Sequence, residues 1–291
     1  MHAHPDDETI NSGATMAAYV ARGVSVALVT CTRGEEGEII PAELGHLVAG
    51  RDDALGAERT RELASAMALL GVTDHRFLGE GEPGFAPRIY RDSGMAVAPD
   101  GTVVPAPDIR PDAFALADPD EAAARLATVI RRLRPQVLLT YEPGGGYGHP
   151  DHLQAHRVAM AAVELAERED PACHGAGRAP WRVSKVYWSV LPESAADQAP
   201  AAPDRAVPSF VVPDDEVTTR VDAEAFVSAK AAALRAHATQ VAVAPDGRSF
   251  TLADGAGMPL SGIEYYRLAC GKFGAEVGPD GRESDLFDGI A

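Results

Sequence analysis

The sequence predicts an α/β protein with a Rossmann-like, doubly wound and mostly parallel sheet that carries helices on both faces. Strand-like apolar runs alternate with helix-like segments over the first two thirds of the chain. This alternation is typical of parallel sheets with right-handed crossovers. The strand-like runs are also apolar nearly throughout, as strands buried on both faces are. Ligands of such sheets bind outside the carboxyl ends of the strands, so we expect the active site at that edge.

The expected elements follow one another along the chain. Residues 8–22 are predicted to form a helix that ends at Gly23, because glycine commonly follows a helix C-terminus. Residues 50–70 carry apolar side chains at helical spacing. Residues 79–118 are rich in Gly, Pro and Asp, which predicts a long functional loop or lid. The remaining elements are the strands VSVALVTCT, HRFLG, PQVLLTY and VSKVYWSVL and the helices DPDEAAARLATVIRRLR, DHLQAHRVAMAAVELAERE and DAEAFVSAKAAALRAHATQ.

Composition and charge narrow the class of partner. The 291 residues carry a formal net charge of -17, which repels nucleic-acid backbones and anionic lipid. We therefore expect a neutral or cationic small-molecule substrate, no nucleic acid and no membrane. The three cysteines are far apart and lack CxxC spacing, no apolar run approaches the length of a membrane span, and no signal pattern is present. These features predict a reducing, cytoplasmic location.

The start of the chain is short for a strand. Only Met1, His2 and Ala3 precede the first polar motif, whereas a buried strand typically has about five residues. Either the first strand is unusually short or the reading frame extends upstream of Met1, and we expect the latter. On a strand His2 would share a face with His4 and support it, but we expect the terminus that carries His2 to be disordered.

Two short motifs repeat one pattern at equivalent places. HPDD occupies residues 4–7 and HPDH residues 149–152, each where a strand ends and a helix begins. Proline suits the first helical position because its missing N–H would be unpaired there. Residues at i and i+3 on the first turn point the same way. Each motif therefore offers two convergent ligands, and the four candidates are His4, Asp7, His149 and His152.

The four candidates and the acids between them fit metal-assisted hydrolysis. Catalytic zinc uses three protein ligands and one open position, and two histidines with one carboxylate meet this requirement. A spare carboxylate such as Asp6 or Asp151 can take a proton from water. A spare histidine can protonate a leaving amine or stabilise an oxyanion. The pattern predicts a metal-dependent amide hydrolase.

A simpler interpretation exists for each motif alone. Acids in the first turn of a helix often do no more than interact with the helix dipole. A single HPDD is therefore more often structural than catalytic. The two motifs at equivalent places in one architecture favour the metal site.

The motifs also carry a resemblance. HAHPDDE, TCTRGEEGE, RDSGM, TYEPGGGYGHPDH and KAAALRAHATQ resemble the zinc-dependent N-acetylglucosaminyl-phosphatidylinositol deacetylase-like (LmbE-like) superfamily. Within it they are most similar to the mycothiol-pathway branch of N-acetylglucosaminyl-inositol deacetylases. The segments GEEGE and NSGAT look more like this branch than like the sister S-conjugate amidases.

The resemblance implies a role for each site residue. One Zn²⁺ per subunit, or Fe²⁺ in its place, would be bound by His4, Asp7 and His152. Asp6 would be the general base, and His149 would stabilise the oxyanion or help the amine leave, with Asp151 orienting it. Tyr147 would close over the substrate and donate a hydrogen bond to its carbonyl oxygen. The sugar or inositol pocket would be lined by Arg59, Asp92 and Glu38.

The resemblance also implies a reaction and a domain layout. The expected reaction removes the N-acetyl group of 1-D-myo-inosityl-2-acetamido-2-deoxy-glucopyranoside, giving the free amine and acetate. Three alternatives stay open: a mycothiol S-conjugate amidase, a deacetylase of another N-acetyl amino sugar, and a non-catalytic sugar-binding module. We expect one domain over residues 1–291, with a core over 1–192 that carries the metal site and an extension over 193–291 that packs on it. The sequence does not indicate the oligomeric state.

Overall fold

The computed structural model describes residues 1–169, 179–196, 207–253, 255 and 257–290. The predicted alternation of helices and strands is present over the first two thirds of the chain. The elements there are α1 (Asp7–Ala21), β1 (Ala27–Thr30), α2 (Leu55–Leu70), β2 (Asp74–Phe77), β3 (Met95–Val97), β4 (Val103–Pro105), α3 (Pro119–Leu133), β5 (Val137–Tyr141), α4 (Pro150–Glu167) and β6 (Lys185–Pro192).

The last third of the chain adds shorter elements. They are α5 (Glu193–Ala196), β7 (Val211–Val212), β8 (Thr219–Asp222), α6 (Val227–Ala236), β9 (Ala242–Val243), β10 (Ser249–Thr251), β11 (Gly257–Pro259) and β12 (Ile263–Cys270). Short 3₁₀ helices lie at Ala42–Leu47, Phe114–Leu116, Asp214–Glu216 and Glu224–Phe226. None of the helices in the described part of the chain is both long and apolar enough to span a membrane.

The central sheet is mixed, which corrects the expectation of a mostly parallel one. β1 pairs with β2 and β5 pairs with β6 in parallel, as predicted. β12 then pairs antiparallel with β6, and β8 antiparallel with β12. β12 begins at Ile263, far along the chain from the end of β6 at Pro192, so the last third of the chain folds back to extend the same sheet.

The first three residues join the two parallel halves of this sheet. The His2 N–H donates to Val29 O of β1 over 3.0 Å, and the amino group of Met1 donates to Leu139 O of β5 over 2.7 Å. His2 is only 3% exposed. The expectation of a disordered terminus is therefore wrong. Residues 1–3 lie at the point where the strand order reverses, which is where ligands of open α/β sheets bind.

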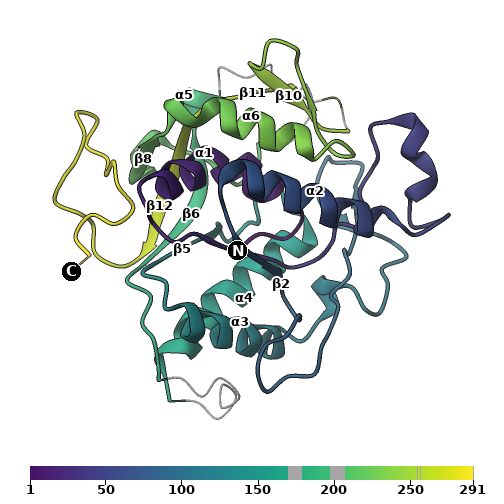
Figure 1. The fold of residues 1–291 in the computed structure, drawn as a ribbon, viewed down its shortest axis with the longest axis horizontal. Coiled ribbons are helices and arrows are strands. Elements are labelled where there is room, and N and C mark those ends of the chain that lie inside the picture. Colours follow the sequence, from purple (N-terminus) through teal and green to yellow (C-terminus); the bar gives the residue numbers. More distant parts are fainter. Residues whose placement is uncertain (170–178, 197–206, 254, 256, 291) are drawn as a thin grey trace.

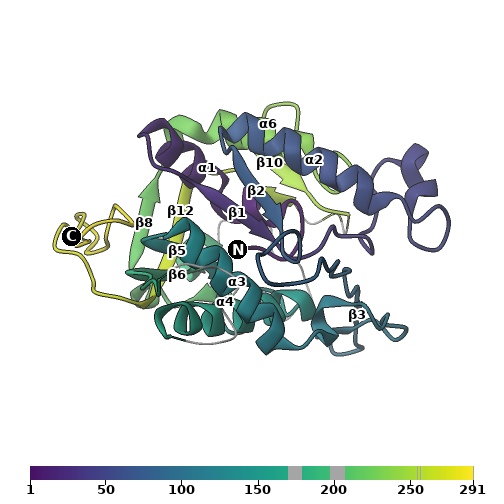
Figure 2. The ribbon, with the colours of Figure 1, turned by 60° about the horizontal axis from the view of Figure 1, so that its bottom comes forward.

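Helices cover both faces of the sheet, as predicted. Figure 2 shows α1, α2 and α6 on one face and α3 and α4 on the other. One apolar cluster combines α3 and α4 with β5, and another packs α1 and α2 against β1. The two helical layers therefore cover both faces of the sheet, and the polar side chains of the two motifs lie at its carboxyl edge.

The long segment after β2 returns to this edge. The predicted loop over residues 79–118 contains the hairpin of β3 and β4. It places Asp92 against His4 of the first motif and Ser93 against Asp151 of the second. Both residues are at most 4% exposed. The segment is therefore part of the site wall and not only a cover.

Candidate active site

Three predicted ligand atoms form a nearly equilateral triangle. Asp7 Oδ2 lies 3.3 Å from His4 Nδ1 and 3.3 Å from His152 Nε2, and the two ring nitrogens are 3.3 Å apart. Ligands about 2.0–2.1 Å from a tetrahedral ion are separated by roughly this distance. The donor set therefore fits a divalent metal ion. His4 also belongs to two wider groups of possible ligands, one with His149 and His152 and one with Asp92, His149 and Asp151.

Neighbouring groups fix the direction of the triangle atoms. His4 Nε2 lies 3.1 Å from Asp151 Oδ2, so it carries the ring proton and leaves a lone pair on Nδ1. Asp7 Oδ2 accepts hydrogen bonds from the Tyr141 hydroxyl (2.8 Å) and from the His4 N–H (2.9 Å). Nδ1 of His152 is buried and has no hydrogen-bond partner in the described part of the chain. His152 therefore interacts through Nε2 alone, which faces the triangle.

Asp6 stands beside the triangle in a strained conformation. Asp6 is the residue that precedes α1. Its backbone has φ 114° and ψ -36°, values that residues other than glycine rarely adopt. Its Oδ2 accepts a hydrogen bond of 3.1 Å from Arg59 Nη2. Burial raises the pKa of Asp6 to about 6. A strained carboxylate with a raised pKa is typical of catalytic sites.

His149 caps α4 and is held in one tautomer. Its Nδ1 accepts the backbone N–H of Asp151 over 3.1 Å, which leaves Nε2 as the N–H donor. Burial and the nearby rings of His4 and His152 lower the pKa of His149 well below its ordinary value. His149 is thus a neutral hydrogen-bond donor.

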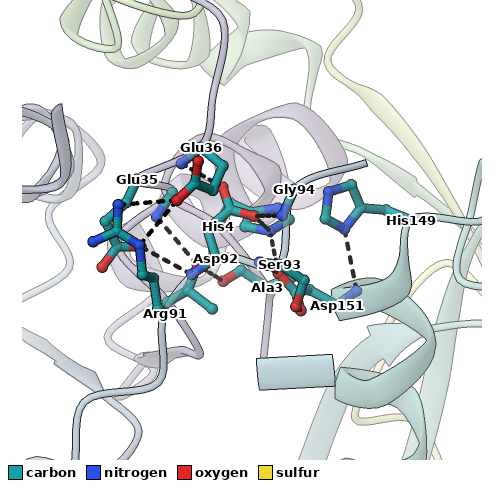
Figure 3. A network of polar contacts seen from close by, with 12 residues as sticks. Ala3, His4, Glu35, Glu36, Arg91, Asp92, Ser93, Gly94, His149 and Asp151 are labelled. Atoms are coloured by element: carbon teal, nitrogen blue, oxygen red, sulfur yellow. Dashed lines mark hydrogen bonds and ion pairs between the residues drawn. The ribbon is translucent and has the colours of Figure 1, made fainter. Parts of the chain in front are cut away.

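The contacts of Asp151 differ from the predicted ones. Its carboxylate binds His4 Nε2 and the N–H and hydroxyl of Ser93, as Figure 3 shows. Only its backbone N–H bonds to His149. The expectation that the Asp151 side chain orients His149 is therefore corrected: helix capping orients His149, and the carboxylate orients His4.

Tyr147 lies on the glycine-rich loop before the second motif. Its ring centroid is 4.9 Å from that of His152 and 6.0 Å from that of His149, and the residue is 41% exposed. Gly145 and Gly146 have positive φ values, and a Cβ on Gly145 would come within 2.7 Å of Leu153 N. These glycines let the loop turn tightly over α4, which places Tyr147 at the mouth of the site.

A cavity of about 250 Å³ lies along the segment that carries Asp92 and Ser93, and none of the three triangle residues lines it. Asp92 lines it, and the Asp92 carboxylate lies 3.4 Å from His4 Nε2. The other two predicted pocket residues do not line it. Arg59 is buried, and it donates to Pro5 O, Gly34 O and Asp6. Glu38 is exposed, with no hydrogen-bond or ion-pair partner among the residues described.

Several supporting residues were not predicted from the sequence. Glu35 accepts the N–H of Asp92, and Ser93 binds Asp151. Tyr141 accepts the N–H of Ala3 and donates to Asp7. Each lies in one of the quoted motifs, but its partner is distant in sequence. Motif membership was the only signal that could have drawn attention to them.

The site and fold together define a metal-dependent hydrolase: a triangle of ligands with a spare carboxylate, at the carboxyl edge of an α/β sheet. Residues 1–163 match the sequence pattern of the GlcNAc-PI de-N-acetylase family, PIG-L. The chain belongs to this family. The expected resemblance and the expected deacetylase class are thereby confirmed.

Full-length relatives share about half of the residues. A protein of Streptomyces avermitilis is 50% identical over 304 residues, covering 100% of this chain and 96% of its own length. A protein of Thermomonospora curvata is 51% identical over 301 residues, covering 100% and 95%. Both bear the name 1D-myo-inositol 2-acetamido-2-deoxy-alpha-D-glucopyranoside deacetylase.

Solved structures share the fold at lower identity. The N,N'-diacetylchitobiose deacetylase of Pyrococcus horikoshii has a TM-score of 0.54 at 20% identity, covering 82% of this chain and 68% of its own. The 4-carboxy-2-hydroxymuconate hydratase GalB of Pseudomonas putida has a TM-score of 0.58 at 19% identity, covering 95% and 97%. One fold thus serves different reactions, so the site must decide the chemistry.

Proposed function

We propose that this protein hydrolyses the N-acetyl group of 1-D-myo-inosityl-2-acetamido-2-deoxy-glucopyranoside, giving the free amine and acetate. The observation that carries the proposal is the 3.3 Å triangle of His4, Asp7 and His152 with Asp6 beside it. The names of the relatives that are about 50% identical over the whole chain support the choice of substrate.

The proposed metal is zinc, bound by His4 Nδ1, Asp7 Oδ2 and His152 Nε2. Two imidazoles and one carboxylate form a common ligand set of catalytic zinc, with ferrous iron as the alternative. When bound, the ion supplies Lewis acidity, which acidifies water and polarises the amide carbonyl.

Asp6 is the proposed general base. It is the acid of the first motif that the triangle leaves free, and its raised pKa brings it closer to the operating pH, as a base requires. The hydrogen bond from Arg59 fixes one of its oxygens, which leaves the other for a water proton. We therefore propose that Arg59 positions Asp6 and does not contact the sugar.

His149 and Tyr147 are the proposed donors to the reacting carbonyl oxygen. The Nε2–H of neutral His149 is free to stabilise negative charge on that oxygen, because capping occupies Nδ1. Tyr147 lies at the mouth of the site and adds its hydroxyl when it closes over the substrate. Asp151 keeps His4 aimed at the metal position.

The cavity beside Asp92 is the proposed place for the substrate hydroxyls. Its wall combines acids and arginines that suit a neutral polyol: Glu36, Arg91, Asp92, Asp108 and Arg110. Glu38 stays a predicted contact without a structural neighbour to support it. We propose a cytoplasmic location, which the cysteine spacing supports, and a small-molecule substrate with no nucleic-acid partner.

Parallel assays test the proposal. Zinc-loaded and iron-loaded protein would be given the acetylated sugar-inositol and a bulky mycothiol S-conjugate, with amine formation measured for each. We expect the larger kcat/KM for the acetylated sugar-inositol. A larger value for the conjugate would make this chain an amidase, and no turnover of either would overturn the proposed substrate class.

A further inference from the structure

The C-terminal end of α6 is directly connected to the first motif. His237 follows Ala236 at the end of α6 and is 0% exposed. Its Nε2 lies 3.0 Å from Oε1 of Glu8, which is also 0% exposed. Figure 1 shows α6 lying over α1 and α2, so two residues 229 positions apart in sequence meet behind the site.

The second oxygen of Glu8 continues this connection to Asp6. Oε2 of Glu8 accepts the backbone N–H of Asp6 over 3.0 Å. In capping boxes a nearby acid likewise reaches back to the N–H of the residue that precedes the helix. The bond fixes the peptide plane on the N-terminal side of Asp6, and this plane sets the direction in which the Asp6 side chain leaves the backbone.

The backbone of Asp6 requires such support. A residue with a side chain at φ 114° costs about 1–3 kcal/mol and persists only where the surroundings hold it. Arg59 holds the carboxylate from α2, and Glu8 holds the amide. Glu8 in turn depends on His237 and on the Thr9 hydroxyl, which donates to the same Oε1 over 2.6 Å.

We propose that His237 is a positioning residue, which through Glu8 keeps Asp6 in its positive-φ conformation and so aims the catalytic carboxylate. The inference rests on the proposed role of Asp6 as general base. Among the residues that the structure describes, His237 contacts Thr9 and Glu8 and not the triangle atoms of His4, Asp7 or His152. His237 therefore acts on turnover and not on metal binding.

Two substitutions at this position separate the role of each ring nitrogen. His237→Gln carries an amide donor near the position of Nε2, whereas His237→Asn carries it near Nδ1. Nδ1 has no hydrogen-bond partner among the described residues. We expect His237→Gln to keep kcat within about threefold and His237→Asn to lower it about ten- to a hundredfold, the scale of a small displacement of a catalytic group.

The decisive measurement repeats His237→Asn in an Asp6→Asn background. A residue that acts through Asp6 has no further effect once the carboxylate is gone, so we expect the second substitution to change kcat less than about twofold there. Metal affinity, measured by competition with a chelator, should stay within about twofold in every variant. Thr239→Val is the matched control, because Thr239 binds Glu62 of α2 from the same segment without touching Glu8.

Each outcome has a separate meaning. Equal losses from His237→Asn in both backgrounds, an unchanged kcat, or a parallel loss of metal affinity would overturn the positioning role. Near-normal turnover of Asp6→Asn alone would instead overturn the general-base assignment, and this inference with it. If His237→Asn does not fold, Thr9→Val removes the other donor to Glu8 Oε1 and tests the same connection in the same two backgrounds.

Discussion

Replacing Ser93 with alanine should weaken metal binding without touching a ligand. The Ser93 hydroxyl donates to the buried Asp151 Oδ1 and accepts the N–H of the partly buried Ala115 over 3.0 Å. Asp151 in turn holds His4 Nε2. Ser93→Ala removes both bonds and leaves the backbone N–H as the only donor from Ser93 to Asp151.

The size of the effect follows from these contacts. Removing the partner of a metal-bound histidine typically costs about ten- to a hundredfold in metal affinity. Ser93→Ala leaves that partner, Asp151, in place and removes one of the hydrogen bonds that hold it. We therefore expect the dissociation constant for zinc to rise by about tenfold, the lower end of this range.

The assay is a competition titration against a chromophoric chelator at fixed pH. Ser189→Ala is the matched control, because the Ser189 hydroxyl is also buried but has no hydrogen-bond partner among the residues that the structure describes. Ser189→Ala should bind zinc as tightly as the unmodified protein. Equal zinc affinity in Ser93→Ala and Ser189→Ala would refute the idea that Ser93 supports His4 through Asp151.

Three further predictions concern the triangle and Asp6. We expect the purified protein to hold about one divalent ion per chain and His152→Ala to lose it. Unchanged metal content, measured by atomic emission, would contradict the ligand assignment. Asp6→Asn should keep the metal but lower kcat about a hundredfold or more, with steady-state kinetics as the check. In the metal-free protein the pKa of Asp6 is about 6 against 3.8 for the unperturbed group, so folding disfavours its ionised form. The resulting loss in the free energy of unfolding is absent below about pH 4 and complete above about pH 6. Metal-free Asp6→Asn should therefore melt at a higher temperature than metal-free wild type at pH 8, and the gap should close by pH 4; a gap independent of pH would show that Asp6 titrates normally.

The sequence predicted the features that depend on local spacing. HPDD and HPDH each place their ligands on one helical turn, so the convergence of His4, Asp7 and His152 follows from the motif and the parallel strands before it. The alternation of apolar runs likewise predicted the helices α1–α4 and α6 and the strands β1, β2, β5 and β6. In both cases the controlling interactions lie within a few residues.

The features that were missed depend on partners far apart in sequence. β12 (IEYYRLAC) carries charged residues among its apolar ones and was not predicted, and its antiparallel pairing with β6 is set only when the chain folds back. Glu8 has the appearance of a first-turn acid that meets the helix dipole, yet its partner is His237. Arg59 was predicted to line the substrate pocket, but its three hydrogen bonds to the first motif and Gly34 are visible only in three dimensions.

The way β12 and α6 join α1 limits how this protein can be recombined with its relatives. Glu264 of β12 accepts the N–H groups of Ala14 and Thr15 in α1 and pairs with Lys230 of α6 over 2.7 Å. Breaking a buried pair of this kind costs about 3–5 kcal/mol. The stretch that matches the family pattern ends at residue 163, inside α4, so it is not an exchangeable module. A chimera that takes α1 from one relative must take α6 and β12 from the same parent to keep this buried junction intact.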